Sequence, residues 1–201
     1  MRRFSTFALM HPEFIAYIKR QANLTDDEVK LVCSKGVERT IPRKQLLLQQ
    51  GEICRHKVFV SKGCFSTFRT KEDGVKHIID FSAEDSWIVD PESYNHGTPT
   101  AYSIEALEES VIIQWTKNDF NDLFAQIPQI KAYSEKLVSE KLLTIRQRLY
   151  SAISSTAEEK YDEFIKTYPA VFARVPLHMV ASYLGVSRET LSRIRQAQVR
   201  R

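Results

Sequence analysis

The sequence lacks the residue patterns that define several large classes of protein. Its three cysteines, Cys33, Cys54 and Cys64, are an odd number at wide spacing, and the chain has no C-x-x-C pair. This spacing argues against a disulfide framework and against a zinc, iron–sulfur or redox-sensing site, so we interpret them as ordinary thiols. No apolar run approaches the ~18 residues that a membrane-spanning helix needs, and we expect no membrane partner.

Glycine is also scarce, and catalytic motifs are missing. The six glycines are scattered and form no glycine-rich phosphate-binding loop. No nucleophile motif accompanies them, so we expect no catalytic residue, no cofactor and no enzyme activity. The opening stretch "MRRFSTFALMHPEF" has too short an apolar run for a signal peptide. We therefore expect a cytoplasmic globular protein, and 201 residues allow one large domain or a large and a small one.

Positive charge is concentrated near the end of the chain. Residues 169–201 hold six arginines, one glutamate and no lysine, a net charge of +5, whereas the whole chain carries +4. A basic terminal segment is typical of a protein that binds a polyanion. Charge alone, however, is explained equally well by an arginine face that is merely solvated.

The middle of the chain, Ile41 to Thr116, has the pattern of a β domain. Residues 11–40 before it are helical in pattern and contain a capping box of Thr25 and Glu28. At least six strands with regular turns predict a sandwich or a barrel. The apolar or alternating runs that predict these strands are KQLLLQQ, KVFVSKGCFSTFRT, VKHIIDFS, TAYSIEAL and SVIIQWT.

A long helix is predicted from Pro128 to Ser154, where no internal proline or glycine occurs. Apolar residues repeat along it at intervals of 4, 3, 4 and 3, which is typical of a coiled-coil seam. A second copy of the helix would bury this stripe, so we predict a homodimer with two-fold symmetry. The alternative is that the stripe packs on the β domain of its own chain. The seam consists of Val138, Leu142, Ile145, Leu149 and Ala152.

Three shorter helices are predicted after this one. Ser155 and Glu158 have the spacing of a second capping box, and a proline ends the helix that they begin. The stretch VPLHMVASYLG ends at Gly185, and VSRETLSRIRQ begins its helix after Ser187 as N-cap. A helix, a tight turn that contains glycine and a second helix are the signature of a helix-turn-helix.

The last helix has the chemistry of a helix that enters the major groove of DNA. Arginine can donate two hydrogen bonds to guanine, and glutamate can accept one from cytosine. Serine and threonine hydroxyls and a helix N-terminus bind phosphate. Leu191 and Ile194 are three residues apart and face back toward the preceding helix. The candidate DNA-binding residues are Ser187, Arg188, Glu189, Thr190, Ser192, Arg193 and Arg195.

The stretch GVSRETLSRIR resembles the recognition-helix motif of the Crp/Fnr family of bacterial transcription regulators, and VPLHMVASYLGVSRETLSRIR is similar to the family's whole helix-turn-helix. The resemblance implies an α+β protein with three parts. Residues 1–127 would form a cyclic-nucleotide-binding-like sensor domain, a jelly-roll-like double-stranded β-helix. Residues 128–154 would form the dimerisation helix, and residues 155–201 the DNA-binding domain.

The resemblance also implies partners and residue roles. A homodimer would bind a palindromic operator in double-stranded DNA, with RNA polymerase and an unknown small-molecule effector as further partners. Arg188, Glu189 and Arg193 match the family positions that contact bases, whereas Ser187 and Thr190 match those that contact phosphate.

Two departures from the family pattern change the expected function. Family members continue into a β-hairpin wing, whereas this chain stops at Arg201, so we expect no full wing. Arg195, Arg200 and Arg201 would supply part of the missing attraction to the DNA backbone.

The second departure concerns the effector. Members that bind cyclic AMP hold its phosphate with an arginine–serine pair, and Thr100 and Ala101 stand at those positions here. A buried cyclic phosphate without a cation is unfavourable, so we predict no response to cyclic AMP or cyclic GMP. Glu84 matches the ribose-binding glutamate, and Trp87 lies nearby, so these four residues are candidates for lining a pocket for another ligand.

An enzyme is the alternative. His56, His77 and His96 lie in the β region with Glu84, and a double-stranded β-helix is also the fold of cupin metalloenzymes. The H-x-H spacing of cupin ligands is missing, so a metal site is not expected. In this alternative the chain is a cupin-like metalloenzyme or a ligand-binding protein, and its C-terminal helices serve only for packing.

Overall fold

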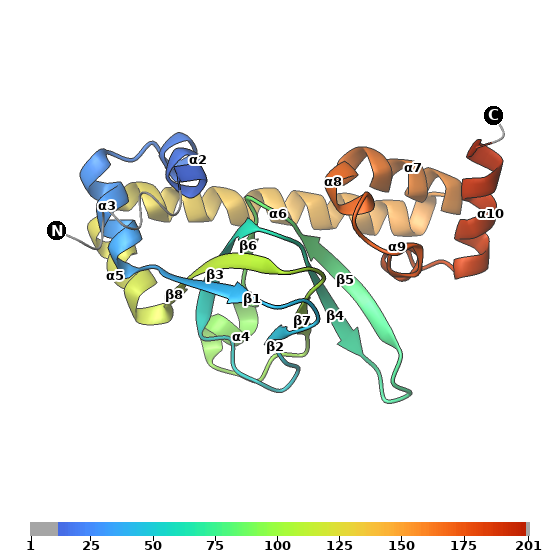
Figure 1. Ribbon diagram of the computed structural model, residues 1–201, viewed down its shortest axis with the longest axis horizontal. Coiled ribbons are helices and arrows are strands. Elements are labelled where there is room, and N and C mark those ends of the chain that lie inside the picture. Colours follow the sequence, from blue (N-terminus) through green and yellow to red (C-terminus); the bar gives the residue numbers. More distant parts are fainter. Residues whose placement is uncertain (1–11, 200–201) are drawn as a thin grey trace.

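The computed structural model describes residues 12–199 and has helices at both ends of the chain with two β-sheets between them (Figure 1). The helices before the sheets are α2 (Pro12–Ala22) and α3 (Asp26–Lys35). The strands are β1 (Val37–Ile41), β2 (Leu46–Leu48), β3 (His56–Lys62), β4 (Phe65–Thr70), β5 (Lys76–Ser82), β6 (Trp87–Ile88), β7 (Ser103–Ala106) and β8 (Ser110–Thr116), with helix α4 (Pro91–His96) between β6 and β7. The helices after the sheets are α5 (Lys117–Gln126), α6 (Pro128–Ser154), α7 (Ala157–Thr167), α8 (Pro169–Phe172), α9 (Leu177–Leu184) and α10 (Arg188–Val199).

The eight strands form two antiparallel four-stranded sheets, in the orders β1-β8-β3-β6 and β2-β7-β4-β5. The prediction of at least six strands is confirmed. Strands of both sheets contribute to one apolar core, in which Ile41, Val60, Phe65, Ile104 and Ile112 are buried. Within the described residues, no helix is both long enough and apolar enough to cross a membrane.

The helical pattern predicted for residues 11–40 is correct for most of its length and wrong at its end. Its capping box is confirmed, because Thr25 and Glu28 each accept a hydrogen bond from the other's backbone N–H. Residues 37–40, however, belong to strand β1, which pairs with β8. Gly36 lies between α3 and β1, where the chain passes close to β8. A Cβ atom at this position would lie 2.9 Å from the Ile113 side chain, so only glycine fits without a shift. His11 lies outside the described residues, as does most of the apolar N-terminal stretch.

The N-terminal helices and α5 cover the outer face of the first sheet. Phe14 of α2 lies edge-on to Phe59 of β3, with ring centroids 4.8 Å apart. Trp115 of β8 is fully buried, and its indole N–H donates a hydrogen bond to the Val32 carbonyl at 2.9 Å. Tyr133 anchors the first turns of α6 in the same core, where its hydroxyl lies 2.7 Å from that of Tyr17. The start of the long helix is therefore fixed against the β-sheets.

Helix α6 has the predicted bounds and runs along most of the molecule, from the N-terminal helices to the C-terminal ones (Figure 1). The predicted seam does not pack on the β-sheets. Val138, Leu142, Ile145 and Leu149 are 54–67% exposed, and Ala152 is exposed as well. Within residues 12–199 nothing covers this apolar stripe, which removes the alternative that the sheets of the same chain bury it.

The last four helices share one apolar cluster, which extends onto the second sheet. The second capping box is shifted by one residue from its predicted position. Thr156 and Glu159 form it, rather than Ser155 and Glu158. The backbone N–H of Ser155 still donates to the Ser151 carbonyl at 3.0 Å, so Ser155 ends α6 and is not available to begin α7.

Candidate DNA-binding surface and its attachment to the sheets

A tight turn joins helices α9 and α10. Gly185 has φ +68°, in the left-handed region that glycine adopts without strain. Its N–H donates to carbonyls of the last turn of α9, and α10 starts at Arg188. Only residues 185–187 separate the two helices, as the sequence predicts. The turn therefore sets the angle between the two helices through glycine geometry.

The inner face of α10 is held by α9. Leu191 is fully buried in the cluster that contains Val180 and Ala181 of α9. Ile194 and Leu184 are partly buried and pack against the same cluster. The packing expected for Leu191 and Ile194 is therefore present in the structure, and it determines which face of α10 points to solvent.

The outer face of α10 carries the residues that sequence reasoning selected. The Ser187 hydroxyl accepts a hydrogen bond from the Thr190 N–H at 3.1 Å, so Ser187 is the N-cap. The two hydroxyls lie 3.0 Å apart, and Arg193 donates to the Thr190 hydroxyl at 3.5 Å. Among the seven candidates, Thr190 and Ser192 are half-buried, whereas the other five are exposed: Ser187, Arg188, Glu189, Arg193 and Arg195.

Glu189 is held as an ionised acceptor within this basic surface. Hydrogen bonds from its own backbone N–H and from Ser187 lower the pKa of its carboxyl group, and the charges of Arg188 and Arg193 lower this pKa further. An ionised carboxylate can only accept hydrogen bonds. The surface therefore presents two arginine donors and one carboxylate acceptor on adjacent turns. Arg200 and Arg201 lie outside the described residues.

The C-terminal helices are attached to the free edge of the second sheet. Strand β5 is an edge strand of that sheet, and α9 packs on it. The Ser182 hydroxyl of α9 accepts from the Ile78 N–H at 3.0 Å and donates to the Lys76 carbonyl at 3.2 Å. Ser182 thereby satisfies backbone groups that an edge strand would otherwise expose.

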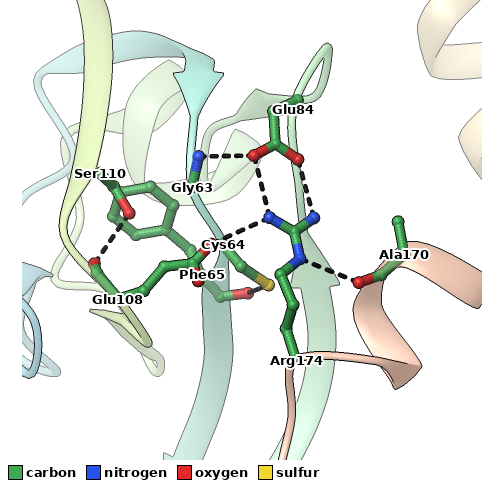
Figure 2. A network of polar contacts seen from close by, with 8 residues as sticks. All are labelled: Gly63, Cys64, Phe65, Glu84, Glu108, Ser110, Ala170 and Arg174. Atoms are coloured by element: carbon green, nitrogen blue, oxygen red, sulfur yellow. Dashed lines mark hydrogen bonds and ion pairs between the residues drawn. The ribbon is translucent and has the colours of Figure 1, made fainter.

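Arg174, between α8 and α9, makes a second attachment to the sheets (Figure 2). Its guanidinium forms a two-pronged ion pair with Glu84, at 2.9 and 2.7 Å, and donates to Glu108 at 2.9 Å. The Gly63 N–H donates to Glu84 at 2.7 Å, and the Arg174 Nε–H donates to the Ala170 carbonyl at 2.9 Å. Mainly through the hydrogen bonds from Arg174, the pKa of Glu84 is lowered to about 2.

Arg148 of α6 makes a third attachment. Its guanidinium lies 3.9 Å from the centre of the Tyr183 ring, a cation–π geometry. It also donates to the carbonyls of Tyr183, at 2.9 Å, and of Ile79. One side chain thus connects the long helix, strand β5 and helix α9.

The four candidates for a ligand pocket are not gathered in one cavity. The carboxylate of Glu84 forms the ion pair with Arg174. Trp87 is packed among aromatic rings, and its indole N–H donates to the Tyr133 hydroxyl at 3.1 Å. Thr100 is buried and donates to the Asp90 carboxylate, while Ala101 lies in the bend beside it.

Asp90 is a residue that sequence reasoning missed. It caps helix α4 as well as accepting from Thr100. The Asp-Pro pair at the start of α4 was the available signal, because an N-cap aspartate followed by proline is typical of a helix start.

The structure contains a cavity of about 560 Å³ in a different place, between the two sheets, and none of the four candidates lines it. Residues from both sheets and from the loop before β3 form its wall. They include Arg39, Leu48, Cys54, Arg55, His56 and Ile104. Sequence reasoning did not select the two arginines, because Arg39 joins Arg55 and His56 only when β1, β8 and β3 pair.

The cysteines and histidines do not form a shared centre. Cys33, Cys54 and Cys64 are free and buried. Burial raises the pKa of Cys33 to about 12 and that of Cys64 to about 11. From Pro12 to Val199, no three His, Cys, Asp or Glu side chains are grouped so that they could hold a metal ion.

Known proteins are similar to this chain in both sequence and fold. The cyclic nucleotide-binding domain family matches residues 38–127. The chain is 23% identical to the transcriptional activator protein Anr of Pseudomonas aeruginosa over 183 residues, which are 84% of this chain and 72% of that protein. It is also 23% identical to Anr of Pseudomonas protegens over 188 residues, or 86% of this chain and 74% of that one.

Solved structures agree on the fold. FixK2 from Bradyrhizobium japonicum has a TM-score of 0.71 and 15% identity, and the match covers 81% of this chain and 83% of FixK2. The catabolite activator protein of Thermus thermophilus has a TM-score of 0.55 and 20% identity, and the match covers 88% of this chain and 84% of that protein.

Two antiparallel sheets followed by a C-terminal helical part define the class, a cyclic nucleotide-binding-like domain joined to helices. Residues 38–127 belong to the cyclic nucleotide-binding domain family, and over most of its length the chain is similar to transcription regulators of the Crp/Fnr type.

Proposed function

We propose that the protein is a homodimeric, sequence-specific DNA-binding transcription regulator of the Crp/Fnr type. In this proposal residues 1–127 form a jelly-roll-like sensor domain, residues 128–154 the dimerisation helix and residues 155–201 a helix-turn-helix DNA-binding domain. The observation that carries the proposal is the exposed face of α10, which is held outward by the burial of Leu191.

We assign the DNA contacts by chemistry. Arg188 and Arg193 donate to guanine edges, and Glu189 accepts from cytosine, as its ionised state requires. Ser187 and Thr190 lie at the helix N-terminus, where hydroxyls and backbone N–H groups bind phosphate. Ser192 and Arg195 flank these residues and contact the backbone.

The exposed seam of α6 supports the dimer. A continuous apolar stripe on a 27-residue helix is unfavourable in water, and a second copy of the same stripe covers it by symmetry. Such a dimer presents two recognition helices about 34 Å apart, one turn of DNA, to a palindromic site.

The surroundings of Thr100 argue against a cyclic nucleotide effector. The hydroxyl of Thr100 donates a hydrogen bond to the carboxylate of Asp90, so the position expected to hold a phosphate has an acid beside it and a threonine in place of the arginine. An anion placed next to a carboxylate would be repelled. Another effector would act by binding two orientations of the C-terminal helices with different affinity, with a hinge between Ser151 and Thr156.

Selection of bound DNA from a random pool tests this proposal. We expect the wild-type protein to enrich a palindrome whose half-sites lie one turn apart. The double variant Arg188→Ala/Arg193→Ala should lose the enriched bases, whereas Arg43→Ala/Arg69→Ala, which removes two exposed arginines elsewhere, should enrich the same site as wild type. If the wild-type protein enriches no sequence, or the recognition-helix variant enriches the same one, the proposal is wrong.

A further inference from the structure

The cavity between the sheets combines an apolar floor with a cationic rim. Leu48, Val58 and Ile104 are buried and form part of its floor. Arg39 and Arg55 are exposed at its rim. A volume of about 560 Å³ is in the range of cavities that hold small organic ligands.

The positive charge of the rim is not balanced within the described part of the chain. Neither Arg39 nor Arg55 forms an ion pair there, and Arg39 only donates to the neutral Gln114 amide at 3.2 Å. Glu52 is the acid among the lining residues, and one of its oxygens accepts from the Gln49 N–H at 2.9 Å.

His56 lines the same cavity as the two arginines. Burial lowers the pKa of its imidazole, and the charges of Arg39 and Arg55 lower this pKa further. Both guanidinium groups are therefore close enough to repel a proton on His56. Two guanidinium groups at one cavity create a positive potential that attracts an anion.

The cavity wall is fixed rather than loose. The Gly51 N–H donates to the Thr100 carbonyl at 2.9 Å, and the Thr100 N–H donates to the Glu52 carbonyl at 2.8 Å. The Cys54 N–H donates to the buried Ser93 hydroxyl at 2.8 Å. These bonds tie the arginine-bearing loop to the segment around α4, so the site is preorganised before a ligand arrives.

We propose that this cavity binds a small organic anion, with its apolar body against the floor and its acidic head between Arg39 and Arg55. The planar guanidinium groups suit a carboxylate or a related oxyanion, because each can donate two parallel hydrogen bonds. Thr100 and Ala101 do not line this cavity, and the proposal goes beyond DNA binding because it concerns the sheets and the loop before β3.

The test uses two fluorescent probes of similar shape and different charge. The anion is 8-anilinonaphthalene-1-sulfonate, and the neutral control is N-phenyl-1-naphthylamine. We expect saturable binding of the anion to the full chain, and displacement by decanoate. In Arg39→Gln/Arg55→Gln the dissociation constant should rise at least tenfold, and in the matched Arg43→Gln/Arg69→Gln it should stay within twofold. Binding of the neutral probe should be the same in all three proteins.

The exposed stripe of α6 could also attract the probe, so the binding site is located separately. In amide NMR spectra, the anion should shift the signals of Gly51 and the Gln114 side chain. The charge-preserving variant Arg39→Lys/Arg55→Lys should keep these shifts and so show that loss of charge, not unfolding, abolishes binding. Equal anion affinity in both glutamine variants, or unchanged Gly51 and Gln114 signals, would overturn the proposal. Operator binding is measured without the probe, so failure here leaves the proposed function intact.

Discussion

At the scale of single residues, Arg174 is a side chain that joins the C-terminal helices to the β-sheets. It lies 90 positions from Glu84 in the sequence, yet both of its terminal nitrogens reach that carboxylate (Figure 2). Glu84 is partly exposed, so solvent weakens the attraction. The two-pronged geometry, with Glu108 as a second acceptor, fixes the orientation of the segment between α8 and α9.

The first prediction at this scale concerns pH. The carboxyl pKa of Glu84 is about 2 in the folded chain and about 4.5 in the unfolded one. A lowered pKa stabilises the fold fully above the unfolded value, and this stabilisation is lost as the pH falls from about 4.5 to 2. Glu84→Gln should therefore unfold at a lower temperature than wild type at pH 7, and the difference should shrink toward pH 2.

Glu109→Gln is the matched control, because Glu109 is exposed and is adjacent to Glu108. Its unfolding temperature should follow that of the wild type at every pH. Thermal unfolding followed by circular dichroism measures all three proteins. A constant difference between Glu84→Gln and wild type from pH 7 to pH 2 would show that the ion pair contributes no pH-dependent stability.

At the scale of elements, α6 has two neighbouring faces that differ in their surroundings. One face holds the molecule together, where Lys141 pairs with Asp80 and Arg148 reaches β5 and α9. The adjacent face carries the exposed apolar seam. A helix with this division can connect the sheets to the C-terminal helices and bind a second copy at the same time.

The seam gives the next prediction. Leu142→Asp places a carboxylate in the centre of the predicted dimer interface, where burial of an unpaired charge costs several kcal/mol. We expect this variant to be monomeric in light scattering, with unchanged helix content. Gln147→Asp adds the same charge to the exposed helix away from the seam and should remain dimeric. A monomeric wild type, or a dimeric Leu142→Asp, would contradict the dimer.

Much of this element structure could be predicted from the sequence, because the signals are local. Pro128 begins α6, Gly185 ends α9, and Ser187 caps α10, each within one turn of the backbone groups that it affects. The capping box of α7 was misplaced because Ser155 and Thr156 both have a glutamate three residues later. The end of α6 decides between them, because Ser155 still belongs to the last turn of α6 and leaves Thr156 to cap α7.

The sites that sequence reasoning missed depend on contacts between distant residues. Arg39 faces the cavity because β1 pairs with β8, which also places Gln114 beside it. Glu84 was expected at a ligand site, but Arg174 from the last part of the chain occupies it. No periodicity or motif within a short segment predicts either arrangement, since each requires the tertiary fold.

At the scale of the whole molecule, polar contacts of three kinds hold the C-terminal helices against the sheets and α6. Ser182 binds the edge of β5, Arg174 binds two acids, and Arg148 stacks on Tyr183. The outer face of α10 lies away from these contacts and stays open (Figure 1). These contacts hold α9 and the segment before it, and they do not involve the residues proposed to bind DNA.

The central claim, that α10 contacts specific bases, is tested most directly by operator affinity as a function of salt. Arg188→Ala/Arg193→Ala should weaken operator binding by roughly 1–3 kcal/mol for each arginine that contacts a base. Affinity of wild type for the selected operator should fall about a thousandfold between 50 and 200 mM salt, because a dimer with about six phosphate contacts releases counterions. The variant should bind the operator no better than a scrambled duplex. Equal operator affinity in wild type and variant, or binding that does not change with salt, would contradict the account.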